Sequence, residues 1–282
     1  MSRAVAAAGW RLRIEEALRR EELRLPVMPD IVARVQLEAA RRNGSAGSLA
    51  RVVEADPGLA ARVVKMANSA MFAGLCEIRD LTHAVGRLGS GMVVAIVLGA
   101  AARECFRAAH PGYARRAHDS WEISLLAAAA ARSLALRAGE DPEEAFLAGL
   151  LHRAGEPILL QAVPLLAERD GEPVPPAETI GPVVDELAPV AGATLLSRWN
   201  LPEPIVTAVR FQNDPAAAPR EDLRRTALTA LARRLGEALF AGEGAEALTG
   251  DPSAAALGLD EEAIAAAAPE AAAGAGELAR AL

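Results

Sequence analysis

The sequence contains few aromatic residues, two cysteines and one lysine. Aromatic residues make up 3% of the 282 positions, whereas hydrophobic residues of all kinds make up 52% and are dominated by alanine. Strands favour aromatic and β-branched residues, so this composition argues against extensive sheet and favours close-packed helices, for which alanine is the best former. Cys76 and Cys105 lie outside any Cys-x-x-Cys pattern, which excludes a disulfide framework and a cysteine zinc site.

Long hydrophobic runs and an excess of positive charge are also missing. The longest apolar stretch, Met92 to Ala102, is too short to span a bilayer. The weakly apolar residues at positions 4–10 are followed at once by Arg11 and Arg13, which does not fit a signal peptide. The net charge is −7 and the pI is near 5.3, whereas non-specific binding to nucleic acid needs a basic surface. We therefore expect a cytoplasmic protein with neither a membrane nor a nucleic-acid partner.

Helical spacing of apolar residues runs along most of the chain. Asp56-Pro57 and Asp141-Pro142 each place an N-cap carboxylate before a proline in the first helical turn. The segment from Asp170 to Pro182 is rich in proline, glycine and glutamate, and we expect an exposed loop there. The pattern predicts an all-α chain, with helices near residues 2–24, 30–42, 49–54, 57–66, 80–88, 91–107, 119–138, 142–152, 183–199, 202–212 and 220–240 and a last pair after residue 242.

An ordered set of short motifs extends from about residue 25 to the C-terminus. In chain order the motifs are Leu25-Pro26-Val27-Met28-Pro29, Glu54-Ala55-Asp56-Pro57-Gly58-Leu59, Met66-Ala67-Asn68-Ser69-Ala70, Trp121-Glu122-Ile123-Ser124, Ala145-Phe146-Leu147-Ala148-Gly149-Leu150-Leu151-His152 and Leu195-Leu196-Ser197-Arg198-Trp199-Asn200-Leu201-Pro202. No single motif is specific, but the ordered set resembles the HDOD family, the HD-related output domain of bacterial signalling proteins.

The resemblance implies the domain organisation. An N-terminal helical bundle is expected to pack on a C-terminal bundle related to HD phosphohydrolases, and the two are expected to meet near residues 105–120. The chain then divides into an N-terminal helix at 1–24, an N-terminal helical subdomain at 25–110, and an HD-like subdomain with alanine-rich C-terminal helices at 111–282.

The resemblance also identifies where catalytic relatives hold a divalent metal, and this sequence departs from them at those positions. The family's His-Asp pair falls at His152-Arg153. Its other ligand positions carry Ile123, Ala188, Gln212-Asn213 and Arg233. An arginine has no lone pair to offer a metal, and one histidine cannot replace the set of about three protein ligands that a catalytic metal needs. We expect no bound metal, no cofactor and no enzymatic activity.

Two interpretations of this degenerate site stay open. In the first, His152 is a buried histidine bonded to its neighbours, and Arg153 pairs with Glu156 three residues further along the helix. That pair reverses both charges of the family's aspartate and lysine. In the second, Arg153 and Arg233 together convert a cation-binding pocket into one that suits phosphate or carboxylate, since guanidinium groups bind both.

We expect a non-enzymatic signal-transduction or scaffold domain that works through protein partners. One alternative is a sensor for a small anionic ligand, a phosphate or a nucleotide, in the arginine-substituted pocket. A divergent phosphohydrolase is the other alternative, and it would need a complete metal cluster. His118-Asp119 is a second His-Asp pair, but it lacks the family context, and we interpret it as a solvated cap at a helix start. Trp121 and Trp199 are predicted to be core anchors.

Overall fold

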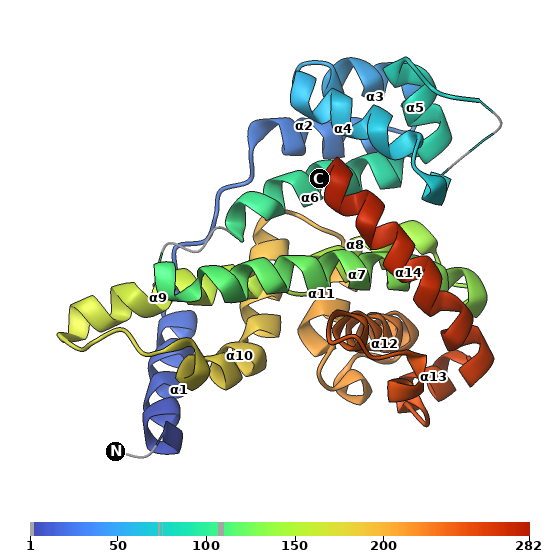
Figure 1. Ribbon diagram of the computed structural model, residues 1–282. Coiled ribbons are helices and arrows are strands. Elements are labelled where there is room, and N and C mark those ends of the chain that lie inside the picture. The colour runs from blue at the N-terminus through green and yellow to red at the C-terminus, as the bar shows by residue number, and fades with distance from the viewer. Residues whose placement is uncertain (1–2, 73, 75, 107–109) are drawn as a thin grey trace.

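The computed structural model describes residues 3–72, 74, 76–106 and 110–282, and over these residues the chain forms helices and turns without any strand. The all-α prediction is confirmed, and Figure 1 shows the two bundles one above the other.

The N-terminal bundle consists of α2 (Asp30–Ala39), α3 (Ala46–Val53), α4 (Pro57–Ala67), α5 (Leu81–Leu88) and α6 (Ser90–Cys105). The C-terminal bundle consists of α1 (Arg3–Arg19), α7 (Ala114–Ala138), α8 (Pro142–Leu151), α9 (Gly155–Asp170), α10 (Ala177–Arg198), α11 (Glu203–Phe211), α12 (Leu223–Phe240), α13 (Pro252–Leu257) and α14 (Glu261–Ala281). Short 3₁₀ turns are η1 (Ala70–Phe72), η2 (Pro111–Tyr113), η3 (Pro215–Ala217), η4 (Arg220–Asp222) and η5 (Ala245–Leu248).

Capping side chains start several helices where the sequence predicts them. The Asp56 carboxylate accepts a hydrogen bond from the Leu59 amide at 3.1 Å, and Pro57 follows as the first helical residue. Asp141 caps α8 in the same way, through the amides of Glu143 and Glu144. These bonds satisfy amides that have no partner within the first turn of a helix, which fixes the helix starts locally.

The long helix α7 forms the centre of the C-terminal bundle and packs against α8, α12 and α14. Small residues let these helices approach closely. A Cβ atom added to Gly149 of α8 would lie 2.7 Å from the Ala127 carbonyl oxygen of α7. One added to Gly236 of α12 would lie 2.9 Å from the Ala127 amide nitrogen. The alanine-rich composition therefore has a direct structural use, since larger side chains at these positions would push the helix axes apart.

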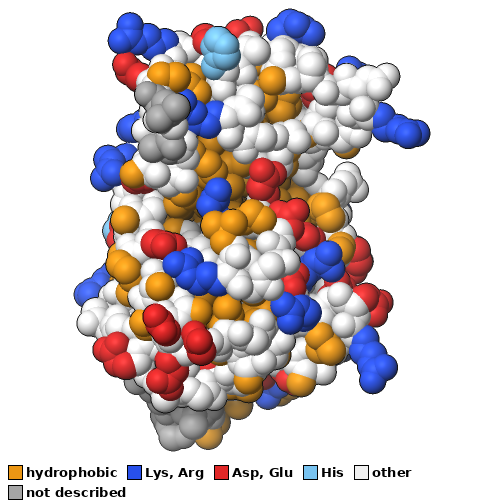
Figure 2. Space-filling view, turned by 90° about the vertical axis from the view of Figure 1, so that its right-hand side faces the viewer, with side chains coloured by type: hydrophobic (Ala, Val, Ile, Leu, Met, Phe, Trp, Pro, Cys, Tyr) orange, Lys and Arg blue, Asp and Glu red, His pale blue; other side chains and the backbone are white. Residues whose placement is uncertain are grey.

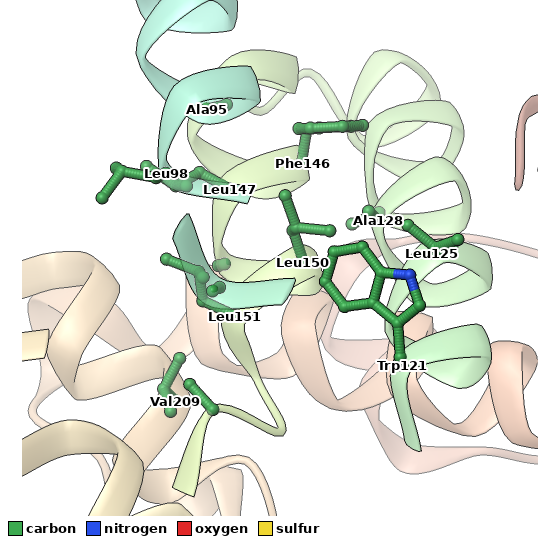
Figure 3. Close-up of a cluster of buried hydrophobic side chains, with 14 of the residues drawn as sticks. Ala95, Leu98, Trp121, Leu125, Ala128, Phe146, Leu147, Leu150, Leu151 and Val209 are labelled. Atoms are coloured by element: carbon green, nitrogen blue, oxygen red, sulfur yellow. The ribbon is translucent and has the colours of Figure 1, made fainter. Parts of the chain in front are cut away.

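The core between the bundles is built on α8. Figure 3 shows Phe146, Leu150 and Leu151 of α8 packed among side chains of α6, α7 and α11, including Trp121 of α7. Leu150 is fully buried, Leu151 is 1% exposed, and Trp121 is 7% exposed. Trp199 is also buried, so the prediction that both tryptophans anchor the core is confirmed. Because α8 is held on several sides, the residue that follows it has a fixed position.

The two bundles meet over a wider surface than residues 105–120. The Phe106 and Trp121 rings lie 5.4 Å apart at the two ends of that stretch, but α6 also packs along α8 and α4 packs against α14. Helix α1 precedes the N-terminal bundle in sequence yet packs on α10 and α9 of the other bundle (Figure 1). The C-terminal bundle therefore contains helices from both ends of the chain.

The prediction of an exposed loop from Asp170 to Pro182 is wrong over most of its length. Helix α9 continues to Asp170 and α10 begins at Ala177, so only six residues connect the two helices. Pro182 lies inside α10, where a proline removes one backbone hydrogen bond. Ile180 and Val184 are fully buried on this helix, and their burial offsets that loss.

Within the described ranges, no single helix is long and apolar enough to cross a membrane. Helices α5 and α6 reach the required length and composition only as a pair, and they are bent by 106° at the break between them.

Candidate functional site

A cavity of about 480 Å³ lies between the α8–α9 turn, α10, the end of α11 and α12. Seven of the eight residues singled out from the sequence line it. These are His152, Arg153, Glu156, Ala188, Gln212, Asn213 and Arg233. The eighth, Ile123, is half-buried on α7 and is not part of the wall. Three residues earlier on α7, Ser120 reaches the site instead, and Ile123 is turned from it by about 60° around the helix axis.

His152 is the C-cap residue of α8, and its side chain is 1% exposed. Its Nδ1 atom lies 2.6 Å from the Gly149 carbonyl oxygen, which can only accept, so Nδ1 carries the proton. The Gln212 side chain donates to the His152 carbonyl oxygen at 2.8 Å. Burial, and then the charges of Arg153 and Arg233, hold the pKa of His152 well below its ordinary value. The imidazole is therefore neutral, and its Nε2 lone pair has no hydrogen-bond partner within the described chain.

Arg153 makes two ion pairs that connect separate helices. One guanidinium nitrogen donates to Glu156 at the start of α9, and another donates to Glu237 of α12 at 2.6 Å. Burial lowers the pKa of Arg153, but Glu156, Glu237 and Asp185 outweigh that effect and raise the pKa above its ordinary value. Its side chain is 13% exposed. Arg153 is therefore a charged, largely enclosed bridge between the α8–α9 turn and α12.

Glu156 is the most enclosed carboxylate of the cavity, with 3% of its side chain exposed. Besides Arg153, it accepts a hydrogen bond from the Ser120 hydroxyl at 2.6 Å and one from Arg116 at 3.2 Å. Arg116 also pairs with Asp185 of α10. The buried negative charge is thus matched by two guanidinium groups and one hydroxyl, as a buried carboxylate requires.

Arg233 completes the cavity on the α12 side. Its Nη1 atom donates to both carboxylate oxygens of Glu237, at 3.0 and 3.1 Å. Glu237 therefore lies between two guanidinium groups, those of Arg153 and Arg233, and 32% of its side chain is exposed. The structure brings Arg153 and Arg233 together around a carboxylate that belongs to the protein itself.

Sequence reasoning missed four residues of this network, Arg116, Ser120, Asp185 and Glu237, and it also missed Glu186 on the cavity wall. Helical spacing could have found some of them. Glu237 lies four residues after Arg233, and Asp185 lies three residues before Ala188, so each shares a helix face with a position already singled out. For Arg116 the sequence carries no such indication, because its partner Glu156 is on another helix.

The histidines outside the cavity do not form a second site. The interpretation of His118-Asp119 as a cap at a helix start is wrong, because α7 begins at Ala114 and His118 lies in its second turn, 3.6 Å from Glu122. Arg115 pairs with Asp119, so both members of the pair interact along their own helix. Among the described residues, no three His, Cys, Asp or Glu side chains gather closely enough to hold a metal.

Comparison with known proteins decides the family. The model of the HDOD domain matches residues 25–215, which is more than half of the chain. The chain belongs to the HDOD domain family. An HDOD domain protein from Geobacter sulfurreducens is similar over 95% of this chain and 99% of its own, at 21% identity and a TM-score of 0.71. A proposed metal-dependent phosphohydrolase from Shewanella amazonensis is similar over 94% and 99%, also at 21% identity and a TM-score of 0.71. At this identity the two structures establish the fold alone.

Two further relatives are longer than this HDOD chain. A proposed signal transduction protein from Marinobacter aquaeolei is 27% identical and has a TM-score of 0.67; the match covers 100% of this chain and 68% of that protein. An uncharacterized protein from Treponema pallidum is 24% identical over 204 residues, 70% of this chain. The chain spans 39% of the length of that relative.

The residues of the cavity do not fit the divalent metal that a likeness to phosphohydrolases implies. Where a carboxylate ligand would stand beside His152, Arg153 presents a guanidinium group, and Arg233 adds a second. The charges of both arginines lower the pKa of His152, so they already disfavour a further positive charge at its ring. A cation at Nε2 would meet two positive charges, and within the described part of the chain no set of three His, Cys, Asp or Glu side chains could complete its coordination.

Proposed function

We propose that this HDOD chain is a non-catalytic signalling domain that acts through contacts with protein partners in the cytoplasm. One observation supports the proposed loss of catalysis. The position of the metal-binding aspartate holds Arg153, and that arginine is engaged by Glu156 and Glu237. The description of the Marinobacter relative as a proposed signal transduction protein supports the signalling role.

The magnitude of the charge effect supports the loss of metal binding. A divalent cation about 4 Å from a guanidinium charge would be repelled by about 8 kcal/mol at an effective dielectric constant of about 20. A single imidazole ligand does not offset a repulsion of that size, and the second guanidinium group adds to it. The network of Arg153, Glu156 and Glu237 instead serves as a structural connection between the α8–α9 turn, α9 and α12.

The loss of catalysis is tested by assaying phosphodiester hydrolysis in the presence of added manganese. We expect the wild-type chain and the Arg153→Asp variant to be equally inactive, because the variant restores one ligand but leaves Ile123, Ala188 and Arg233 in place. Turnover by the wild type that a chelator abolishes would contradict the proposal.

The role in protein contacts needs a separate experiment. The tagged, folded chain is used to capture proteins from the cytoplasm of its native host, and the heat-unfolded chain serves as the control. A partner recovered in near-stoichiometric amount by the folded chain alone is the expected result. Recovery of the same proteins by both forms would contradict a role that depends on this fold.

A small-anion receptor is the second candidate function, and one observation favours it. Four buried side-chain nitrogens of this network have no hydrogen-bond partner within the described chain. They are the Nε atoms of Arg116, Arg153 and Arg233 and the Nε2 atom of His152. Three of these residues, all but Arg116, line the cavity, and because buried polar atoms are normally paired, their presence there suggests a ligand.

A further inference from the structure

Residues that line the cavity carry both buried hydrogen-bond donors and one buried acceptor without a recorded partner. Arg153 and Arg233 offer unpaired N–H groups, which suit the oxygens of an anion. His152 differs, because its proton is held at Nδ1 by the Gly149 carbonyl and its buried Nε2 atom can only accept. A fully deprotonated anion would place a lone pair against that lone pair. An occupant that satisfies all three side chains must carry negative charge and at least one O–H group.

Glu237 occupies the place of such an anion. Its carboxylate bridges Arg153 and Arg233, at 2.6 Å from the first and at 3.0 and 3.1 Å from the second. Its side chain is 32% exposed, so it can turn toward solvent without a movement of the backbone. Glu237 makes the one ion pair recorded for Arg233 among the described residues, whereas Arg153 keeps Glu156 when Glu237 leaves. Displacement of Glu237 therefore leaves Arg233 without its recorded ion pair and removes one of the two ion pairs of Arg153.

We propose that the cavity binds a protonated oxyanion, with hydrogen phosphate as its simplest form, which displaces Glu237 from Arg153 and Arg233 and donates its O–H group to Nε2 of His152. The inference rests on the proposed loss of the metal site, because a resident metal would occupy that Nε2 atom. No covalent bond is made or broken in this exchange, in which one carboxylate is replaced by one oxyanion.

The acceptor makes the site selective. Hydrogen phosphate and sulfate are both tetrahedral dianions at about pH 8, but only hydrogen phosphate retains an O–H group; a phosphate monoester loses its last proton above about pH 6. The site should therefore prefer inorganic phosphate to sulfate by about tenfold, the difference between a satisfied and an unsatisfied buried acceptor. The two ions form a matched pair, because charge and shape are constant while the donor is changed.

The test measures phosphate and sulfate binding by isothermal titration calorimetry at about pH 8 in metal-free buffer with a chelator. We expect Glu237→Gln to bind phosphate about tenfold more tightly than the wild type, because the internal competitor loses its charge. Glu186→Gln is the control: Glu186 lines the same cavity and loses the same charge, but it pairs with Arg11 and not with Arg153 or Arg233. Its phosphate affinity should stay near that of the wild type.

A second variant tests the acceptor. His152→Phe keeps a planar ring without a lone pair and should bind phosphate and sulfate equally, with the sulfate affinity of the wild type. Circular dichroism is used to check whether this variant folds. If the variant is unfolded, the ratio of phosphate to sulfate affinity in Glu237→Gln alone tests the inference.

Equal affinities for the two ions in Glu237→Gln would overturn the inference, as would an equal gain in Glu186→Gln. Absence of binding in every variant, with or without manganese, would also overturn it and would leave the proposed function intact. Binding that appears only after manganese is added would instead contradict the proposed function itself.

Discussion

At the level of single residues, Arg153 determines the character of the cavity. It neutralises the buried Glu156 and connects the α8–α9 turn to α12 through Glu237. Removing charges from water is costly, and such a pair adds little net stability compared with apolar residues of the same volume. Breaking the pair from one side is different, since it leaves the other charge buried without compensation.

Replacing Glu156 by glutamine leaves Arg153 and Arg116 facing a neutral amide. We expect the free energy of unfolding in denaturant to fall by about 3 kcal/mol. A double-mutant cycle on Arg153→Asp and Glu156→Lys should show coupling, although the double variant stays less stable than the wild type because the introduced lysine would face Arg116. Additive effects would show that the two residues do not interact. Glu16→Gln, in the exposed pair with Arg20, is the control and should change stability by less than about 0.5 kcal/mol.

The buried neutral histidine predicts a dependence of stability on pH. The pKa of His152 in the folded chain is lower than its ordinary value of 6.5. At a pH below that value, the unfolded chain therefore binds a proton at this residue more readily than the folded chain does. The contribution of the neutral histidine to the free energy of unfolding is fully present above that pH. It is lost as the pH falls toward the folded pKa, by about 1.4 kcal/mol per pH unit. Denaturant unfolding between about pH 7 and pH 5 should therefore show a steeper loss for the wild type than for His152→Phe. Parallel curves would contradict this assignment.

At the level of helices, local patterns predict where a helix begins better than how it packs. Asp56 and Asp141 are caps in the structure because an N-cap depends only on residues within the next turn. The loop predicted for 170–182 fails because tertiary burial of Ile180 and Val184 outweighs the proline content of the segment. The packing of α1 on α10 could not be predicted, since no local pattern marks contacts between helices distant in sequence.

The contact between α9 and α10 is the element-level feature on which the cavity depends. A Cβ atom added to Gly155 would lie 2.0 Å from the Ala188 carbonyl oxygen and 2.5 Å from the Gly192 amide nitrogen. Both are backbone atoms, so the helices themselves would have to move. We expect Gly155→Ala to lower the free energy of unfolding by about 3 kcal/mol, as overpacking does. In Gly9→Ala, also within a helix, the added methyl group meets nothing within 4 Å, and we expect a gain of up to about 1 kcal/mol. Equal effects in the two variants, measured by chemical denaturation, would show that the close approach has no energetic importance.

At the level of the whole molecule, the end of α14 connects the two bundles through hydrogen bonds. Arg62, Lys65 and Arg103 of the N-terminal bundle donate to the carbonyl oxygens of Ala281, Arg280 and Leu282, respectively. Figure 2 shows the face beside α14, where hydrophobic side chains gather in the hollow between the bundles. Cations at the last carbonyls of a helix compensate both its unpaired acceptors and its dipole.

Arg103→Met should weaken that connection, because a charged donor to a buried backbone oxygen is lost. We expect a decrease of about 2 kcal/mol in stability and faster amide hydrogen exchange in the last turns of α14. Arg79→Met serves as the control, since Arg79 is 85% exposed and its ion pair is with the exposed Glu77. Unchanged exchange in α14 of Arg103→Met would show that apolar packing alone holds the bundles together.

In the proposed function, a network of arginines and carboxylates takes the place of a metal site. Elemental analysis of the chain, produced in cells supplied with manganese, iron and zinc and isolated without chelators, tests this most directly. We expect less than about 0.1 equivalent of any of these metals per chain, because His152 lacks the further ligands that a bound metal needs. One or two equivalents of metal per chain, lost in a His152→Phe variant that still folds, would contradict it.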